Sequence, residues 1–353
     1  MDSDDPAAGG VRREDNARVG NGGRVGITAV GSALPEQVLT TADLQRRVAD
    51  ESGLDLPDGL VENLTGIKTR RIARDDEYSS TFAVAAARDA LAKAGLDVSD
   101  VDLLLFASAT RDVAEPATAH IVQAELGMES HCFDVSNACN SFLNGIDVAR
   151  SMVLAGRARR ALVVTGEVPT RVIRWKLDDL EQGRAAMAGF TFGDGGAAVV
   201  VEPVERGGIL DVATLTRSEH WDVGGVPGGG TRFPRGDDHS YFRGDGRGLR
   251  DAFEKIGPVV FDALWARTGW GWDDFARVLV HQVTMPYLDR FLEVSGAPRD
   301  LLEVTLPELG NMASATLGVQ LARVDPSLRP GDRVLFVGLG GGVSVMTIVW
   351  EKA

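Results

Sequence analysis

A long internal repeat constrains the fold of this chain more than any other feature of its sequence. The segment "VDLLLFASAT" (101–110) resembles "FARVLVHQVT" (275–284), and two later segments, "FGDGGAAVVVE" and "GLGGGVSVMTIVWE", each join a glycine turn to an apolar run. Strand-like and helix-like segments alternate within each copy, which is typical of α/β layering. Because the period is too long for a solenoid, the sequence predicts two copies of one α/β unit.

The repeat also sets the expected domain limits. We expect an N-terminal half over 25–204 and a C-terminal half over 205–353. Residues 1–24 are charged and have no apolar stretch of the kind found in signal peptides, so we interpret them as a disordered tail. No apolar run approaches the roughly 18 residues needed to cross a bilayer, and the expected location is the cytoplasm.

Cys139 and Asn311 occupy equivalent places in the two copies. Each precedes a helix-like segment and then a strand-like run, which starts at Ala161 in the first copy and at Arg333 in the second. Both separations are 22 residues (161 − 139 and 333 − 311). If a pseudo-twofold axis relates the halves, strand ends and helix N-termini near that axis converge on one site.

Three residues at such places suggest chemistry when they are taken together. Cys139 at a helix N-terminus would meet free backbone N–H groups and the helix dipole, which favour the nucleophilic thiolate; a buried structural cysteine is the alternative. His281 ends a strand-like run, and the alternative to a role in the site is a core histidine. For Asn311 the alternative is a helix N-cap. Together they predict a nucleophile, a proton carrier and a second hydrogen-bond donor.

Composition argues against several other classes of protein. The formal net charge of −14 does not suit a nucleic-acid partner, since phosphates need clustered Lys and Arg. The two cysteines, Cys132 and Cys139, are too few for a disulfide framework or a cysteine-based zinc site, and we expect no metal.

Three glycine-rich stretches remain. "GLGGG" (338–342) lacks the Lys-Ser/Thr of a phosphate-binding loop, and we interpret it as a close approach of the backbone to the site, where an amide N–H faces a developing oxyanion. We expect "FGDGG" to be a structural turn in which Asp194 bonds neighbouring backbone. Segment 220–247 is glycine-rich and charged, and we expect it to cover the mouth of the site.

These motifs occur in the order seen in one known family. "GIKTRRIA", "DVSNAC", "FGDGGAA", "HQV" and "GLGGG" resemble the ketoacyl synthase III branch of the thiolase superfamily, over about residues 25 to 353. The resemblance implies an α/β thiolase fold of two βαβαβαββ halves, in α-β-α-β-α layers, and a homodimer. It also implies acyl-CoA or acyl-carrier-protein thioesters as substrates and no separate cofactor.

The same resemblance implies roles for individual residues. Cys139 matches the nucleophile that accepts the acyl group. His281 and Asn311 match the pair that stabilises the enolate of the second substrate. The backbone N–H groups of Cys139 and Gly341 match the oxyanion hole.

One subgroup is more similar than the rest. The stretch from "RDVAEPATAH" to "ALVVTGE" is similar to the OleA-type enzymes of olefin and β-lactone pathways, which join two acyl-CoAs by a non-decarboxylative Claisen condensation. Their extra base is a glutamate supplied across the dimer, and Glu115 in "AEPAT" matches it. The alternative for Glu115 is a carboxylate that complements a helix N-terminus.

The chain also departs from the family pattern. Asn140 follows the nucleophile where a small or aliphatic residue is more usual, and we expect it to narrow or polarise the acyl pocket. No tryptophan precedes "GIKTRR" to stack on the adenine of CoA. Lys68, Arg70 and Arg71 are candidates for contacts with CoA phosphates, or else a solvated basic turn.

Other activities remain open at this point. A decarboxylating synthase that uses malonyl-ACP or malonyl-CoA would need His281 and Asn311 but not Glu115. An acyltransferase would pass the acyl group from Cys139 to an alcohol or amine. A non-catalytic partner subunit is disfavoured because such partners typically lack the cysteine.

Overall fold

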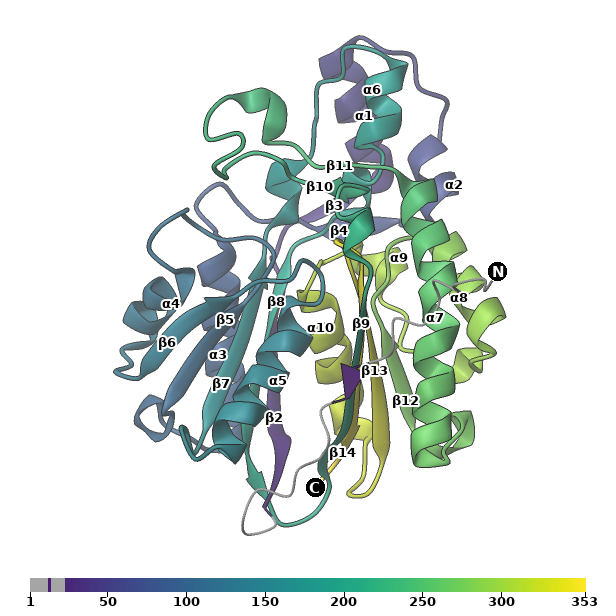
Figure 1. Ribbon diagram of the computed structural model, residues 1–353. Helices are drawn as coiled ribbons and strands as arrows, with labels where there is room; N and C mark the ends of the chain where they lie inside the picture. Colours follow the sequence, from purple (N-terminus) through teal and green to yellow (C-terminus); the bar gives the residue numbers. More distant parts are fainter. Residues whose placement is uncertain (1–11, 14–22) are drawn as a thin grey trace, which may run out of the picture.

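The computed structural model describes residues 12–13 and 23–353, which form two five-stranded sheets covered by helices (Figure 1). The first sheet has the order β2 (Arg24–Ala33), β8 (Gly195–Val204), β7 (Ala161–Glu167), β5 (Leu103–Ala107) and β6 (His131–Val135). The second has the order β1 (Arg12–Arg13), β9 (Gly208–Thr216), β14 (Ser344–Glu351), β13 (Arg333–Gly340) and β12 (Arg277–Val280).

The two sheets repeat one topology. β2, β8, β7 and β5 take the same places as β9, β14, β13 and β12. The β5–β7 and β12–β13 pairs are parallel, and the pairs that join β8 or β14 to their neighbours are antiparallel. The predicted duplication of an α/β unit is therefore confirmed.

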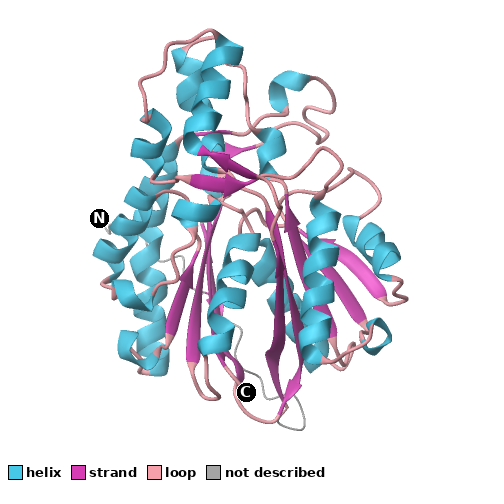
Figure 2. Ribbon diagram, turned by 180° about the vertical axis from the view of Figure 1, so that it is seen from behind, coloured by secondary structure: helices cyan, strands magenta, loops and turns pink. Residues whose placement is uncertain are grey.

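Helices separate and cover the sheets in layers. α5 (Ser141–Leu154) and α10 (Ala315–Val324) lie between the two sheets, as seen from both sides in Figures 1 and 2. The outer face of the first sheet is covered by α3 (Ser79–Ala94) and α4 (Thr118–Leu126), and that of the second by α7 (Gly246–Thr268) and α8 (Met285–Ser295). This is the predicted α-β-α-β-α arrangement of the thiolase fold.

Alternation along the strands explains the layers. In β5, Leu103 and Leu105 belong to the core between the sheets, while Leu104 and Phe106 pack under α3 and α4. In β13, likewise, Phe336 faces the inner core and the residues on either side of it pack against α7 and α8. Such strands are apolar on both faces, as expected of strands buried between helical layers.

The copies differ at one edge. The first half has a full edge strand, β6, beside β5. In the second half its place is taken by a single bridge between Val278 of β12 and Leu302. The βαβαβαββ pattern is thus complete in the first half and reduced by one strand in the second.

Shorter elements form a cap at one end of the sheets, at the top of Figure 1. They are α1 (Thr41–Ser52), α2 (Leu60–Thr65), α6 (Leu180–Ala186), α9 (Leu306–Leu309) and the strand pairs β3 (Val38–Thr40) with β4 (Thr69–Arg71) and β10 (Gly224–Gly225) with β11 (Arg243–Gly244). Leu44, Val48 and Phe190 belong to the apolar cluster of this cap.

The predicted tail, residues 1–24, lies mostly outside the described residues. Arg12 and Arg13 form β1, which pairs with β9, and β2 begins at Arg24. Within the described part of the chain, no helix is both long enough and apolar enough to cross a membrane.

Candidate active site

A cavity of about 840 Å³ brings together residues from both halves of the chain. Cys139, His281, Asn311 and Gly341 all line it. Parts of the glycine-rich segment 220–247 line it too, as expected of a segment that covers the site. The four residues that the sequence assigned to one site therefore do share one cavity.

Cys139 lies in a tight turn between β6 and α5. The preceding residue, Ala138, has a left-handed backbone (φ 47°), which is uncommon for a residue with a Cβ and makes the turn sharp. Ser141 fixes this turn, because its hydroxyl donates to the carbonyl of Ala138 (2.6 Å) and accepts from the N–H of Asn137 (2.8 Å). The turn places Cys139, a partly exposed residue, in the cavity wall.

The thiol is protonated at rest. Burial and, to a lesser extent, the nearby carboxylate of Glu167 raise the pKa of Cys139 to about 12, against the opposing effect of a backbone N–H. The expectation that the helix N-terminus favours the thiolate is therefore wrong for the unliganded site. α5 begins only at Ser141, and desolvation of the thiol outweighs the helix end.

His281 follows the last residue of β12, and its N–H continues the ladder to the carbonyl of Val337 (2.9 Å). Its ring is 2% exposed, and neither ring nitrogen has a hydrogen-bond partner among the described residues. Burial lowers the pKa of His281 to about 4, so the imidazole is neutral at pH 7. A buried neutral ring with two unsatisfied nitrogens is suited to accept a proton from a bound substrate and to donate one to it.

Asn311 is held by the first half of the chain. Its N–H donates to the carbonyl of Thr191 (2.8 Å), and its carbonyl accepts from the N–H of Gly193 (3.0 Å). The side-chain oxygen accepts from the N–H of Ala313 (3.0 Å), while the side-chain N–H₂ makes one long bond of 3.5 Å to the hydroxyl of Thr191. An amide nitrogen has two donors, so one is available to a substrate oxygen.

Cys139 and Asn311 do not occupy identical places in their two turns. α5 begins two residues after Cys139, and α10 begins four residues after Asn311. Each turn contains one left-handed alanine, which precedes Cys139 in the first copy but is Ala313, after Asn311, in the second.

Gly341 lies in the turn between β13 and β14, next to the nucleophile turn. A Cβ built on Gly341 would lie 3.9 Å from the Cβ of Ala138. The turn is held from outside by Arg217, whose N–H and carbonyl bond the carbonyl and N–H of Val343 at 2.9 and 3.1 Å. The turn at Gly341 and the nucleophile turn at Ala138 are thus neighbours across the junction of the two halves, and Gly341 and Cys139 line the same cavity.

Sequence reasoning missed Glu167, the last residue of β7. It is fully buried, and its carboxylate accepts from the N–H groups of Ala109 (2.7 Å) and Thr110 (2.9 Å) and from the hydroxyls of Thr110 (2.6 Å) and Ser314. Burial raises the pKa of Glu167. An acidic residue at the end of a strand-like run that begins with four apolar residues, "ALVVTGE", was the available signal.

Asp194 makes longer-range contacts than predicted. Its carboxylate accepts from the N–H of Ala73 (2.8 Å) and from the N–H (3.1 Å) and hydroxyl (2.6 Å) of Thr170. It is therefore a structural residue, but it joins three segments rather than bonding its neighbours.

Glu115 is exposed and is not among the described residues that line this cavity. Thr110, Arg111 and Asp112, which precede it in the same loop, do line the cavity. Glu115 therefore belongs to the loop at the site but does not line the cavity.

The basic candidates for CoA binding lie elsewhere. Arg70 is fully buried, and its guanidinium donates to the carbonyls of Phe190 and Phe192 and to the hydroxyl of Thr41 (2.8 Å). The expectation for Arg70 is therefore wrong, because it holds the cap together and offers no donor to solvent. Lys68 is exposed and Arg71 is partly exposed, and both lie outside the cavity lining.

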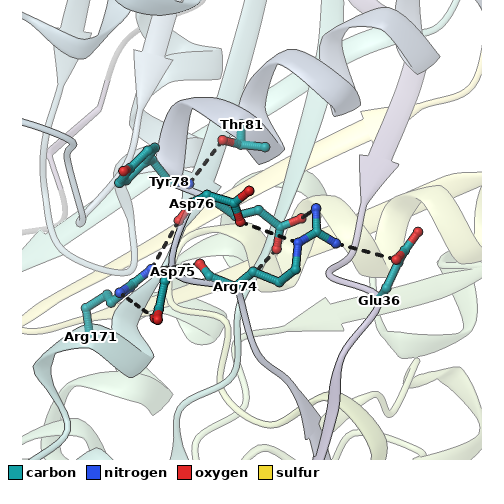
Figure 3. A network of polar contacts seen from close by, with 8 residues as sticks. Glu36, Arg74, Asp75, Asp76, Tyr78, Thr81 and Arg171 are labelled. Atoms are coloured by element: carbon teal, nitrogen blue, oxygen red, sulfur yellow. Dashed lines mark hydrogen bonds and ion pairs between the residues drawn. The ribbon is translucent and has the colours of Figure 1, made fainter.

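Two other arginines, Arg111 and Arg171, do line the cavity. Arg171 is fixed at the rim, where it donates to the carbonyls of Arg74 (2.8 Å) and Glu77 (3.4 Å) and pairs with Asp75 (3.5 Å), as Figure 3 shows. No ion pair of Arg111 is seen among the described residues. The rim therefore carries one anchored and one free guanidinium.

The chain matches the family described as "3-Oxoacyl-[acyl-carrier-protein (ACP)] synthase III" over residues 133–218, and its C-terminal part over residues 265–352. It is 35% identical over 328 residues to the β-ketoacyl-[acyl-carrier-protein] synthase III of Roseiflexus castenholzii, covering 90% of this chain and 95% of the relative. The synthase of Hyphomonas neptunium is 34% identical over 335 residues, covering 92% and 97%.

Solved structures match as well. An OleA from Xanthomonas campestris is similar with a TM-score of 0.83 at 27% identity, covering 93% of this chain and 98% of that one. A FabH, a 3-oxoacyl-(acyl carrier protein) synthase III, from Xanthomonas oryzae gives a TM-score of 0.83 at 28% identity with the same coverage.

The duplicated fold and these similarities define a condensing acyltransferase of the thiolase superfamily, which acts on acyl thioesters. More narrowly, the chain belongs to the β-ketoacyl-[acyl-carrier-protein] synthase III family, since relatives above 30% identity match over nine-tenths of it. The family, fold and enzyme class predicted from the sequence are confirmed.

Proposed function

We propose that the protein joins two acyl-CoA molecules by a Claisen condensation that passes through an acyl-Cys139 intermediate. The observation that carries this proposal is the shared cavity, in which the thiol of Cys139 lies with His281, Asn311 and the turn at Gly341. Splitting the reaction into two half-reactions replaces one difficult step with two easier ones.

In the first half-reaction the sulfur of Cys139 attacks the carbonyl carbon of an acyl-CoA. The neutral imidazole of His281 carries the thiol proton to the departing CoA sulfur, so a new thioester forms as the old one breaks. The tetrahedral oxyanion accepts hydrogen bonds from the backbone N–H groups of Cys139 and Gly341, which become stronger as negative charge develops.

In the second half-reaction an α-proton of another acyl-CoA passes to the carboxylate of Glu115 from the neighbouring subunit of a homodimer. His281 and Asn311 hold the enolate oxygen. The enolate carbon then attacks the acyl-Cys139 carbonyl, and the thiolate of Cys139 leaves and takes up a proton. The product is a β-ketoacyl-CoA.

Two observations support the choice of two acyl-CoAs. The X. campestris OleA structures include one with bound lauric acid and lauroyl-CoA, and others with a substituted cysteine, histidine or glutamate. Glu115 is exposed beside its own site, as required of a base that acts in a partner's site. We also propose Arg111 and Arg171 as contacts for the CoA phosphates, because both line the cavity.

The second candidate is a decarboxylating synthase that extends acyl-Cys139 with malonyl-ACP. The names of the curated relatives favour it. Loss of CO₂ from malonyl generates the enolate without a base, so His281 and Asn311 would suffice.

The deciding experiment incubates the pure protein with acyl-CoAs of several lengths, with and without malonyl-CoA and malonyl-ACP. Mass spectrometry of the intact protein should detect an acyl adduct that Cys139→Ser lacks. Products then separate the candidates: a β-ketoacyl product from simple acyl-CoAs alone supports our proposal. A product that forms only with a malonyl donor supports the second candidate, and an adduct that persists in Cys139→Ser refutes both.

A further inference from the structure

Asn140, the residue after the nucleophile, does not face the acyl pocket as its sequence position suggested. It is fully buried, and it is absent from the described residues that line the main cavity. The side chain points instead into the junction between the two halves, toward the turn that carries Gly341. The expectation that it narrows or polarises the acyl pocket is therefore wrong.

The side-chain amide of Asn140 bonds across this junction. Its Nδ2 donates to the carbonyl of Ser344 (3.0 Å) and to the hydroxyl of Ser344 (2.8 Å). Ser344 is the first residue of β14 and pairs with Gly340, so these two residues close the turn in which Gly341 lies. Since a carbonyl only accepts, the orientation of the Asn140 amide is defined by this contact.

Two glycines of "GLGGG" make room for the amide. A Cβ built on Gly338 would lie 2.1 Å from the Oδ1 of Asn140, and one built on Gly340 would lie 3.0 Å from its Nδ2. Any side chain at Gly338 would displace Asn140. Gly338 and Gly340 therefore leave the space that the side chain of Asn140 occupies.

The two amides of the proposed oxyanion hole come from segments 202 residues apart in the chain (341 − 139). Donors of this kind act only when each lies about 2.7–3.1 Å from the oxyanion, so their spacing has to be fixed. Asn140 is covalently next to Cys139 and hydrogen-bonded to the base of the Gly341 turn. It is thus a direct link between the two donors.

We propose that Asn140 is a positioning residue that sets the distance between the backbone N–H groups of Cys139 and Gly341. This inference rests on the proposed function, because it assumes that these groups stabilise an oxyanion during acylation of Cys139. Asn140 touches no substrate in this proposal and acts only through the two segments that it joins.

The test compares two reactions of the same thiol in Asn140→Ala. Acylation by an acyl-CoA forms a tetrahedral oxyanion, whereas alkylation by iodoacetamide displaces iodide and forms none. We expect the acylation rate to fall roughly 10- to 100-fold, since loss of one oxyanion-hole donor costs about 10²–10³ and a misplaced donor costs less. The alkylation rate should stay within about twofold of wild type, because thiol access and protonation are unchanged.

A matched control is Asn63→Ala, which removes the same side chain from an exposed position on α2, outside the lining of the cavity. Both of its rates should equal those of wild type. Ser344→Ala provides a milder second variant, because it removes only the hydroxyl acceptor and leaves the carbonyl bond. It should lower acylation several-fold and leave alkylation unchanged.

Each alternative outcome is decisive. Wild-type acylation in Asn140→Ala would overturn the inference, and so would equal losses of acylation and alkylation, which indicate damage to the thiol or the fold. If Asn140→Ala does not fold, wild-type acylation in Ser344→Ala would overturn it as well. Failure of wild type to become acylated by any acyl-CoA would instead refute the proposed function, and with it this inference.

Discussion

Ser314, at the start of α10, donates a hydrogen bond to the buried carboxylate of Glu167, at the end of β7. The contact joins the second half of the chain to the first beside the nucleophile. Thr165 also takes part, since its hydroxyl lies 2.7 Å from that of Ser314. The carboxylate raises the pKa of Cys139, so this structural contact also bears on the reactivity of the thiol.

Glu167→Gln should therefore make Cys139 more reactive. Removal of the negative charge lowers the pKa of the thiol, and each unit raises the thiolate fraction at pH 8 by about tenfold. The rate of alkylation by iodoacetamide measures this directly. Glu202→Gln, which removes a carboxylate paired with Arg160 at the far end of β8 (2.6 Å), is the control and should alkylate at the wild-type rate. An unchanged rate in Glu167→Gln would contradict the prediction.

Asn311→Ala should separate the two half-reactions. Asn311 is assigned to the enolate, so acyl-Cys139 should form at nearly the wild-type rate while condensation falls roughly 10²-fold. His281→Ala should lower the rate of condensation at least as much as Asn311→Ala does, and it should lower the rate of acylation by a smaller factor than the rate of condensation. Rapid-quench mass spectrometry of the adduct and product assays give the two rates. Equal loss of both rates in Asn311→Ala would show that the assignment is wrong.

Glu115→Gln should abolish condensation of two simple acyl-CoAs, because an α-proton then has no base. Acylation of Cys139 should remain, and so should any activity with a malonyl donor. Mixed dimers of Cys139→Ala and Glu115→Gln subunits should regain activity, since one of their two sites then has both groups. Verified heterodimers without activity would exclude action across the dimer.

Acid should destabilise the protein in part through His281. The folded protein binds a proton at this ring only near pH 4, whereas the unfolded chain binds it near pH 6.5. Stability is therefore lost as the pH falls from 6.5 toward 4, and this ring contributes about 2 kcal/mol of the loss between pH 7 and pH 5.

His281→Gln should remove that part of the loss, as measured by urea unfolding at the two pH values. His131→Gln, at an exposed histidine of β6, should retain the wild-type difference between them. A His281→Gln variant with the same difference as wild type would refute this account.

The layers could be predicted from local patterns, and the convergence of Cys139, His281 and Asn311 could be predicted from the repeat that relates the two halves. Apolar strands such as β5 and helices such as α3 can be predicted from residues that are close together in the sequence. The burial of Arg70 has no such signal, since its partners Phe190 and Phe192 lie about 120 residues away in the chain.

Electrostatics and contacts between the halves were predicted least well. A helix start suggested a reactive thiolate at Cys139, but the opposing effects come from burial and from Glu167, which only the folded chain brings close. The direction of Asn140 was wrong for a similar reason. Its partner Ser344 lies 204 residues further along the chain, so no local pattern includes both.

The division of the site between two distant parts of the chain has a consequence during protein synthesis. A growing polypeptide exposes Cys139 long before the ribosome adds His281, Asn311 and Gly341. Through that interval the thiol has neither the imidazole nor the second amide donor that the proposed mechanism needs. In the proposed mechanism, therefore, transfer of an acyl group to Cys139 begins only after the second half has been made and has folded onto the first.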